Sequence, residues 1–270
     1  MGNFAHFKAL VNLTLPCTQT RSGLSHLDMS LAGQHAFITG AAKRLGRAMA
    51  EALLQSGVHV SAHYHSSLDA MLDLKKWAEK NTPGRVVPIQ ANLCLLNEVE
   101  AAAHQAQAAL GPIHILINSA SDFYPTPLEA LNREDWDQLF NLNLKAPFFL
   151  THHIFKTMPQ GGNVIFISDV HGTRPIPRYS TYCATKAGLI SLTQSLAKEM
   201  APHIRVNSIS PGTLLPSDCA TQAQVKAAAD RSLLGRVGTP QDLVQGLFFI
   251  LKHHYITGFD LIIDGGRALS

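Results

Sequence analysis

Three side chains in the middle of the sequence have the types and the spacing for acid–base chemistry. Tyr182 and Lys186 are four residues apart in a segment with helical periodicity, so they share one face of a helix. An ammonium that close favours the phenolate and lowers the pKa of a tyrosine from its usual value of about 10. Asp169 follows an apolar run, 163–167, that is typical of a buried strand. We expect these residues to exchange a proton with a substrate while another group supplies a hydride.

Each of these residues also has a plain structural interpretation. Tyr-x-x-x-Lys occurs by chance on solvent-exposed helices, and aspartate often caps a helix or a turn. The functional reading of Tyr182, Lys186 and Asp169 therefore depends on the elements that surround them.

The rest of the chain alternates strands and helices in a way that brings such residues to one edge of a sheet. Strands are expected at 35–39, 58–64, 85–90, 113–118, 163–167, 205–209 and 259–263, and helices at 45–56, 68–80, 97–110, 133–158, 180–201, 221–231 and 240–253. This pattern predicts one α/β domain: a Rossmann-like, doubly wound parallel sheet of about seven strands with helices on both faces. We expect the long helix at 133–158 to be kinked at Pro147.

A glycine turn after the first strand predicts a phosphate site. Gly40 and Gly46 lie between a strand and a helix, whose free amides and positive dipole end suit a pyrophosphate. Lys43 and Arg44 add positive charge, and Arg44 stands where a middle glycine is usual. The second strand ends in 63–67, HYHSS, without the acidic residue that binds a ribose diol, so we favour NADPH over NADH. The alternative is that these histidines simply end a strand.

Composition excludes several classes of function. The chain has 270 residues and a formal net charge of +3, with no basic run interleaved with aromatic residues that would indicate nucleic acid. No apolar run approaches the roughly 18 residues of a membrane helix. The four cysteines lie far apart and no histidine pair has metal-ligand spacing, which favours reduced thiols, a cytoplasmic protein and no metal. Residues 1–30 have no clear periodicity and are expected to form a loose extension before a domain at 31–270, and Met29 could be the natural start.

The motifs together resemble the short-chain dehydrogenase/reductase family. They are, in order, Thr39-Gly40, Asn118-Ser119-Ala120, Asn143, Tyr182-x-x-x-Lys186 and Pro211-Gly212. The stretches 39–46 (TGAAKRLG), 63–67 and 119–128 (SASDFYPTPL) are similar to those of pteridine reductases and dihydromonapterin reductases. Most relatives carry a serine thirteen residues before the catalytic tyrosine, whereas Asp169 stands there in this sequence, as in pteridine reductases.

The resemblance implies an NADPH-dependent reductase that converts a dihydropterin to its tetrahydro form. Dihydrobiopterin and dihydromonapterin are the expected substrates, with dihydrofolate as a further candidate and a homotetramer as the expected assembly. Tyr182 is the implied proton donor, Lys186 its partner and a ligand of the nicotinamide ribose, and Asp169 a contact of the pterin. Asn143 is expected to hold a water in the proton relay, and Phe123 to stack on the pterin.

The implied binding residues form two sets. The substrate set is Arg44, Ser121, Phe123, Asp169 and Tyr182. The cofactor set is Gly40, Lys43, Arg44, Leu45, His63, Tyr64, Ser66, Ser67, Asn92, Leu93, Asn118, Ala120, Ser121, Tyr182, Lys186, Pro211, Gly212 and Thr213.

The sequence also departs from the pattern of pteridine reductases. Ser66 stands where they often have an arginine for the 2′-phosphate, Asn92 replaces the usual aspartate, and Ser119 replaces an asparagine. The segment between Pro211 and Gly235, which closes over substrate in the family, contains no readable feature.

Two other functions fit the same motifs. One is a carbonyl reductase acting on a 3-oxoacyl or similar ketone, which needs neither Asp169 nor the Phe123 platform. The other is a protein that binds NADP(H) as a sensor without turnover, against which the intact Tyr182, Lys186 and Asn143 argue. Phe123 could instead pack a loop, and Asn143 could be an ordinary polar helix position.

Overall fold

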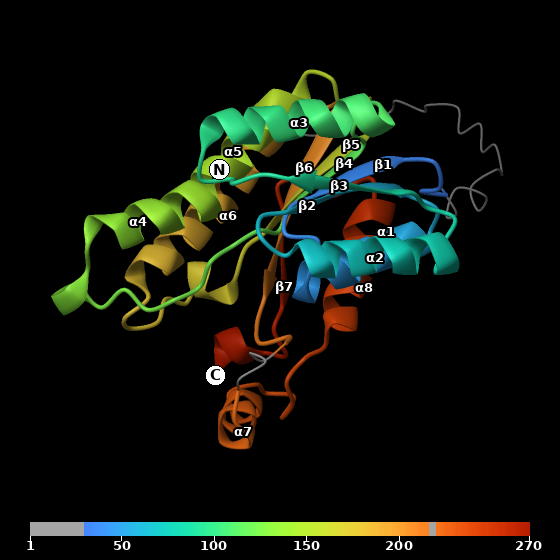
Figure 1. Ribbon diagram of the computed structural model, residues 1–270. Helices are drawn as coiled ribbons and strands as arrows, with labels where there is room; N and C mark the ends of the chain where they lie inside the picture. Colours follow the sequence, from blue (N-terminus) through green and yellow to red (C-terminus); the bar gives the residue numbers. More distant parts are fainter. Residues whose placement is uncertain (1–29, 216–219) are drawn as a thin grey trace, which may run out of the picture.

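The computed structural model describes residues 30–215 and 220–270, and its centre is one parallel sheet (Figure 1). The seven strands are β1 (His35–Ile38), β2 (His59–Tyr64), β3 (Val86–Gln90), β4 (Ile115–Asn118), β5 (Gly162–Ile167), β6 (Ile204–Pro211) and β7 (Asp260–Ile263), in the order β3-β2-β1-β4-β5-β6-β7. The larger helices are α1 (Arg44–Gln55), α2 (Leu68–Asn81), α3 (Leu96–Leu110), α4 (Arg133–Phe140), α5 (Ala146–Phe155), α6 (Ser180–Met200), α7 (Gln222–Asp230) and α8 (Pro240–Lys252). The predicted fold class is confirmed.

The sheet is buried on both faces, which explains its continuous apolar strands. In β4, Ile115 and Ile117 join the core beneath α1, α2 and α8, while Leu116 joins the core beneath α3, α5 and α6. Successive side chains of a strand point to opposite faces, so one short apolar run supplies both cores. The helices of the two cores lie on opposite sides of the sheet in Figure 1.

The direction of winding changes at β1. This strand pairs in parallel with β2 on one side and with β4 on the other, so the connections to its neighbours cross opposite faces. A crevice opens beyond the carboxyl ends of the strands at such a point, and ligands of doubly wound sheets bind there.

The expected single helix at 133–158 is interrupted, which corrects the sequence-based prediction. A π-helical turn, η2 (Asn141–Lys145), separates α4 from α5, and Pro147 lies in the first turn of α5. Proline has no N–H, so Pro147 cannot donate a hydrogen bond to the carbonyl of Asn143 four residues earlier. The wider π-helical turn accommodates this missing hydrogen bond. The disruption therefore centres on the buried Asn143, ahead of the proline.

Some sequence-based predictions lie outside the described residues. These are the loose extension up to residue 29, and with it Cys17 and Met29, and the thiol of Cys219. In the part that is described, Cys94 and Cys183 are free thiols, and no helix has the length and apolarity to cross a membrane.

Candidate active site

Strand β5 and helix α6 bring the carboxylate and the phenol together. The Asp169 side chain caps the short 3₁₀ helix η3 (Val170–Gly172), because its Oδ1 accepts the backbone N–H of His171 at 2.8 Å. Its other oxygen, Oδ2, accepts the hydroxyl of Tyr182 at 2.8 Å. Both Tyr182 and Lys186, one turn further along α6, are almost fully buried.

The pKa of Tyr182 is shifted in the opposite direction to the one expected from the neighbouring Lys186. Burial, followed by the negative charge of Asp169, raises the pKa of Tyr182 well above its ordinary value. Lys186 does not offset this, because its Nζ donates to the carbonyl of Ile167 at 2.9 Å and lies 5.5 Å from the centre of the Tyr182 ring. Burial lowers the pKa of Lys186 to about 8. Tyr182 is therefore a protonated phenol at neutral pH, ready to donate.

The π-helical turn fixes the loop that carries the aromatic platform. Asn143 clamps the backbone of Asp122, with Oδ1 accepting its N–H at 2.9 Å and Nδ2 donating to its carbonyl at 3.0 Å. The next residue, Phe123, is 55% exposed, stacks on Tyr179 at 4.6 Å between ring centres and meets the edge of Tyr182 at 4.7 Å. The Asn143 side chain thus positions this loop, and its expected role in holding a relay water stays a prediction.

The glycine turn presents the start of α1 to the crevice. Within the described residues, no side chain caps this helix and its first turn contains no acidic residue. A Cβ at Gly46 would collide with the carbonyl of Gly40, so only glycine lets the helix start so close to the turn. Gly40 itself has a φ of 67°, in the left-handed region that glycine adopts readily. Uncapped amides beside Lys43 and Arg44 fit the pyrophosphate of a dinucleotide.

His63 braces this turn and is not available to a phosphate, which corrects its predicted role. Its Nδ1 accepts the N–H of Gly40 at 3.1 Å, and its Nε2 lies 3.0 Å from the carbonyl of Ala91. This assigns the proton to Nε2, and burial lowers the pKa of His63 to about 4. The neighbouring Ser66 is exposed and Ser67 half-buried, so their hydroxyls remain accessible.

Some of the other residues expected near the adenosine are buried or form hydrogen bonds within the protein. Asn92 Oδ1 accepts the N–H of Cys94 at 3.0 Å, which shapes the turn into α3. Leu93 and Tyr64 are buried. At the end of β4, neither side-chain polar atom of the buried Asn118 has a hydrogen-bond partner among the described residues. Since buried amides are normally paired, Asn118 fits a contact with a bound cofactor.

A cleft of about 690 Å³ joins the phosphate turn to the acid–base pair. Thirteen of the predicted residues line it: Gly40, Lys43, Arg44, Leu45, Ala120, Ser121, Phe123, Asp169, Tyr182, Lys186, Pro211, Gly212 and Thr213. The predicted residues outside its lining are His63, Tyr64, Ser66, Ser67, Asn92, Leu93, Asn118 and Asn143.

Several lining residues are absent from the predicted site, and three of them, Tyr179, Arg231 and Arg267, have side chains that could bind a ligand. Tyr179 directly precedes α6, three residues before Tyr182, so helical spacing could have identified it. Arg267 follows the carboxyl end of the last strand, where ligands of such sheets bind. No pattern in the sequence indicates Arg231.

Comparison with known proteins identifies the family. Residues 34–228 match the family described as short chain dehydrogenase. The chain belongs to the short-chain dehydrogenase family. This short-chain dehydrogenase is 33% identical over 249 residues to the 3-oxoacyl-[acyl-carrier-protein] reductase FabG of Thermotoga maritima, covering 89% of this chain and 100% of the relative.

Two solved structures resemble the fold of this short-chain dehydrogenase closely. One is FolM alternative dihydrofolate reductase 1 from Brucella canis complexed with NADP, with a TM-score of 0.84, 30% identity, and coverage of 89% of this chain and 96% of the other. The second is a blue fluorescent protein from a metagenomic library in complex with NADPH, with a TM-score of 0.84, 27% identity, and coverage of 89% and 100%. The chain is therefore an oxidoreductase of a family that uses nicotinamide cofactors.

Proposed function

We propose that this short-chain dehydrogenase reduces a dihydropterin to its tetrahydro form with NADPH. The observation that carries the proposal is the 2.8 Å hydrogen bond from the Tyr182 hydroxyl to Asp169. Reduction of a ketone requires only one proton donor, at the carbonyl oxygen. A carboxylate hydrogen-bonded to the proton-donating phenol is therefore not needed for that reaction.

Reduction of a ring C=N bond adds a hydride to carbon and a proton to the adjacent nitrogen. NADPH supplies the hydride when it is bound. The raised pKa of Tyr182 keeps the phenol protonated, and Asp169 lies in position to accept or relay a proton and to bind an N–H of the pterin. Lys186, with a pKa of about 8, is mostly charged at neutral pH and is placed to bind the ribose of the cofactor.

The aromatic wall suits a flat heterocycle. Phe123 and Tyr179 stack on each other beside Tyr182, and Phe123 is exposed to the cleft. A pterin ring can lie against such a face with offset stacking. The proposal is also supported by the similarity to FolM, whose name describes an alternative dihydrofolate reductase.

The cofactor is proposed to be NADPH in preference to NADH. With His63 committed to the glycine turn, we assign the binding of a 2′-phosphate to Lys43, Arg44, Ser66 and Ser67. The end of β2 carries no carboxylate that would repel it. The similar structures complexed with NADP and NADPH support this choice.

A second candidate is reduction of a 3-oxoacyl thioester. The sequence identity of 33% to the FabG protein of Thermotoga maritima favours this reaction. The presence of Asp169, where a serine stands in most of the family, argues for the pterin instead.

The test is NADPH oxidation with dihydrobiopterin, dihydromonapterin or dihydrofolate, each compared with acetoacetyl thioester and repeated with NADH. We expect turnover of a pterin that falls about 100-fold or more in Asp169→Asn, because the neutral amide cannot exchange the proton. Asp169→Ser places the usual family residue there and should lose pterin reduction without lowering any activity that the unaltered enzyme has on the thioester. Asp137→Asn, at an exposed position of α4, is the matched control. Activity on the thioester alone, unchanged in Asp169→Asn, would assign the chain to the carbonyl reductases.

A further inference from the structure

Two arginines on the cleft wall have no part in the chemistry described so far. Arg231 ends helix α7, and Arg267 begins the 3₁₀ helix η4 (Arg267–Leu269) near the carboxyl end of the chain. Both line the same cleft as Asp169 and Tyr182. Within residues 30–215 and 220–270, neither guanidinium forms an ion pair with a carboxylate.

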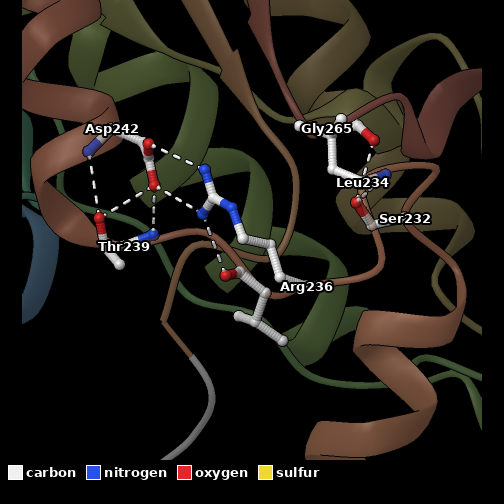
Figure 2. A network of polar contacts seen from close by, with 7 residues as sticks. Ser232, Leu234, Arg236, Thr239, Asp242 and Gly265 are labelled. Atoms are coloured by element: carbon white, nitrogen blue, oxygen red, sulfur yellow. Dashed lines mark hydrogen bonds and ion pairs between the residues drawn. The ribbon is translucent and has the colours of Figure 1, made fainter.

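A turn of two glycines brings these arginines to one wall. Ser232 Oγ and the N–H of Leu234 both donate to the carbonyl of Gly265, at 2.9 and 3.1 Å (Figure 2). A Cβ at Gly265 would collide with Ser232 Oγ, and one at Gly266 would lie 2.8 Å from a methyl group of Leu233. The contact between the two segments therefore requires both glycines.

The backbone around Arg231 is held from both sides. Ser270 Oγ donates to the carbonyl of Arg231 at 2.8 Å. Further along, Arg236 pairs with Asp242 at 3.3 Å, and Asp242 also accepts the N–H of Thr239 at 2.7 Å (Figure 2). The segment from 231 to 239 is thus tied at one end to the last residues of the chain and at the other end to the start of α8.

The two arginines of this wall outnumber the carboxylates that line the cleft. Arg267 Nη1 donates to Thr213 Oγ1 at 2.7 Å, which orients its guanidinium along the cleft. Burial lowers the pKa of Arg267, and the positive charge of Arg231 lowers it further, whereas the charges of Asp169 and Asp264 raise it. Asp264 lies outside the cleft lining, and its carboxylate accepts the N–H groups of Gly266 and Ala268. Two like charges that interact in this way are relieved by a bound anion. Asp169 is the one carboxylate among the described lining residues, and it already accepts the Tyr182 hydroxyl.

We propose that Arg231 and Arg267 bind the carboxylate tail of the substrate, so that the enzyme prefers a dihydropterin with an acidic tail, as in dihydrofolate, to one with a neutral side chain. This inference rests on the proposed function. Guanidinium groups bind carboxylates through paired N–H donors, and Arg231 is exposed while Arg267 is half-buried, so both have donors to offer. We assign Lys43 and Arg44, which lie next to the glycine turn, to the phosphates of the cofactor, and Arg231 and Arg267 to the substrate.

The experiment measures kcat and KM for dihydrofolate, dihydropteroate and dihydrobiopterin with Arg231→Gln, Arg267→Gln and the double variant. For the double variant we expect KM for dihydrofolate to rise about tenfold, and KM for dihydrobiopterin to stay within about twofold, because only dihydrofolate bears the tail carboxylates. Salt at about 0.5 M should raise KM for dihydrofolate alone. Arg267→Lys keeps the charge and should retain most of the affinity for dihydrofolate.

Arg85→Gln is the matched control, since Arg85 is exposed and precedes β3 at the amino end of the sheet, opposite to the cleft. An equal rise of KM for both pterins, or a rise of KM for NADPH, would overturn the inference by assigning the arginines to the ring or to the cofactor. Unchanged KM for dihydrofolate in the double variant would also overturn it. Failure of the proposed function would give a different result: the unaltered enzyme would reduce no pterin, independently of the variants at Arg231 and Arg267.

Discussion

In the proposed reaction, Tyr182 and Asp169 form one proton-transfer unit, because a hydrogen bond joins them. The phenol donates to the carboxylate, and the carboxylate together with burial keeps the proton on the phenol. Lys186 Nζ lies 5.5 Å from the centre of the Tyr182 ring and donates to the carbonyl of Ile167. The sequence predicts all three residues as candidates by type and spacing, but it cannot show which hydrogen-bond partner each side chain has in the fold.

Replacement of the phenol separates catalysis from binding. We expect Tyr182→Phe to lower kcat by about 10²–10⁴-fold, because it removes the proton donor and leaves the ring in place. The dissociation constant for NADPH, measured by fluorescence, should change by less than about threefold. Tyr124→Phe, at a half-buried tyrosine, is the control. An unaltered rate in Tyr182→Phe would contradict the assigned role.

At the scale of single elements, strand β1 depends on a buried histidine at its amino end. His35 Nε2 lies 2.8 Å from Ser61 Oγ on β2, and Nδ1 lies 2.9 Å from the carbonyl of Gly111. Burial lowers the pKa of His35 to about 4. The imidazole is therefore neutral in the folded chain at a pH where it is charged in the unfolded chain.

This difference predicts a loss of stability in acid. Between the unfolded pKa near 6.5 and the folded value, the unfolded state binds more protons, so the free energy of unfolding falls as pH falls. His35 should contribute a loss of roughly 2 kcal/mol between pH 6.5 and 5, at about 1.4 kcal/mol per pKa unit. Urea unfolding at pH 7 and 5 measures it. His35→Asn should reduce the difference, whereas His104→Gln, at an exposed helix position, should leave it unchanged.

The elements show where sequence reasoning succeeds and where it stops. Apolar runs and glycine breaks predict all seven strands and their order along the chain, because these patterns are local. The commitment of His63 to Gly40 depends on how β2 approaches the turn, which no local pattern contains. Arg231 and Arg267 line the same cleft through contacts between segments that are far apart in the sequence, such as that of Ser232 with Gly265.

At the scale of the whole molecule, an apolar groove on one face supports the expected homotetramer, which remains our proposal. Its volume is about 490 Å³, and it lies between α5 and α6 with the π-helical turn at one end. Its apolar lining includes Phe140, Leu144, Phe148, Phe149 and Leu192. A second copy of the chain would cover this face, because helix pairs with apolar surfaces associate by burying them.

A charge in the groove should prevent this association. We expect Phe148→Glu to lower the molar mass measured by light scattering from that of a tetramer to that of a dimer or monomer, because a buried carboxylate without a partner is costly. Leu72→Glu, at a similarly exposed position on α2, should leave the mass unchanged. A monomer in the unaltered protein would exclude the tetramer.

The π-helical turn is equivalent to the insertion of one extra residue into a continuous α-helix. A helical wheel drawn continuously from residue 133 to 158 is out of phase by about 100° beyond Lys145, the rotation of one residue. Shortening the chain by one residue within Asn141–Lys145 would close the wide turn and leave Leu150 and Ile154 facing the core. What would be lost is the inward offset of Asn143, and with it the clamp on Asp122. Chain length at this point therefore governs the shape of the cleft separately from the stability of the helix.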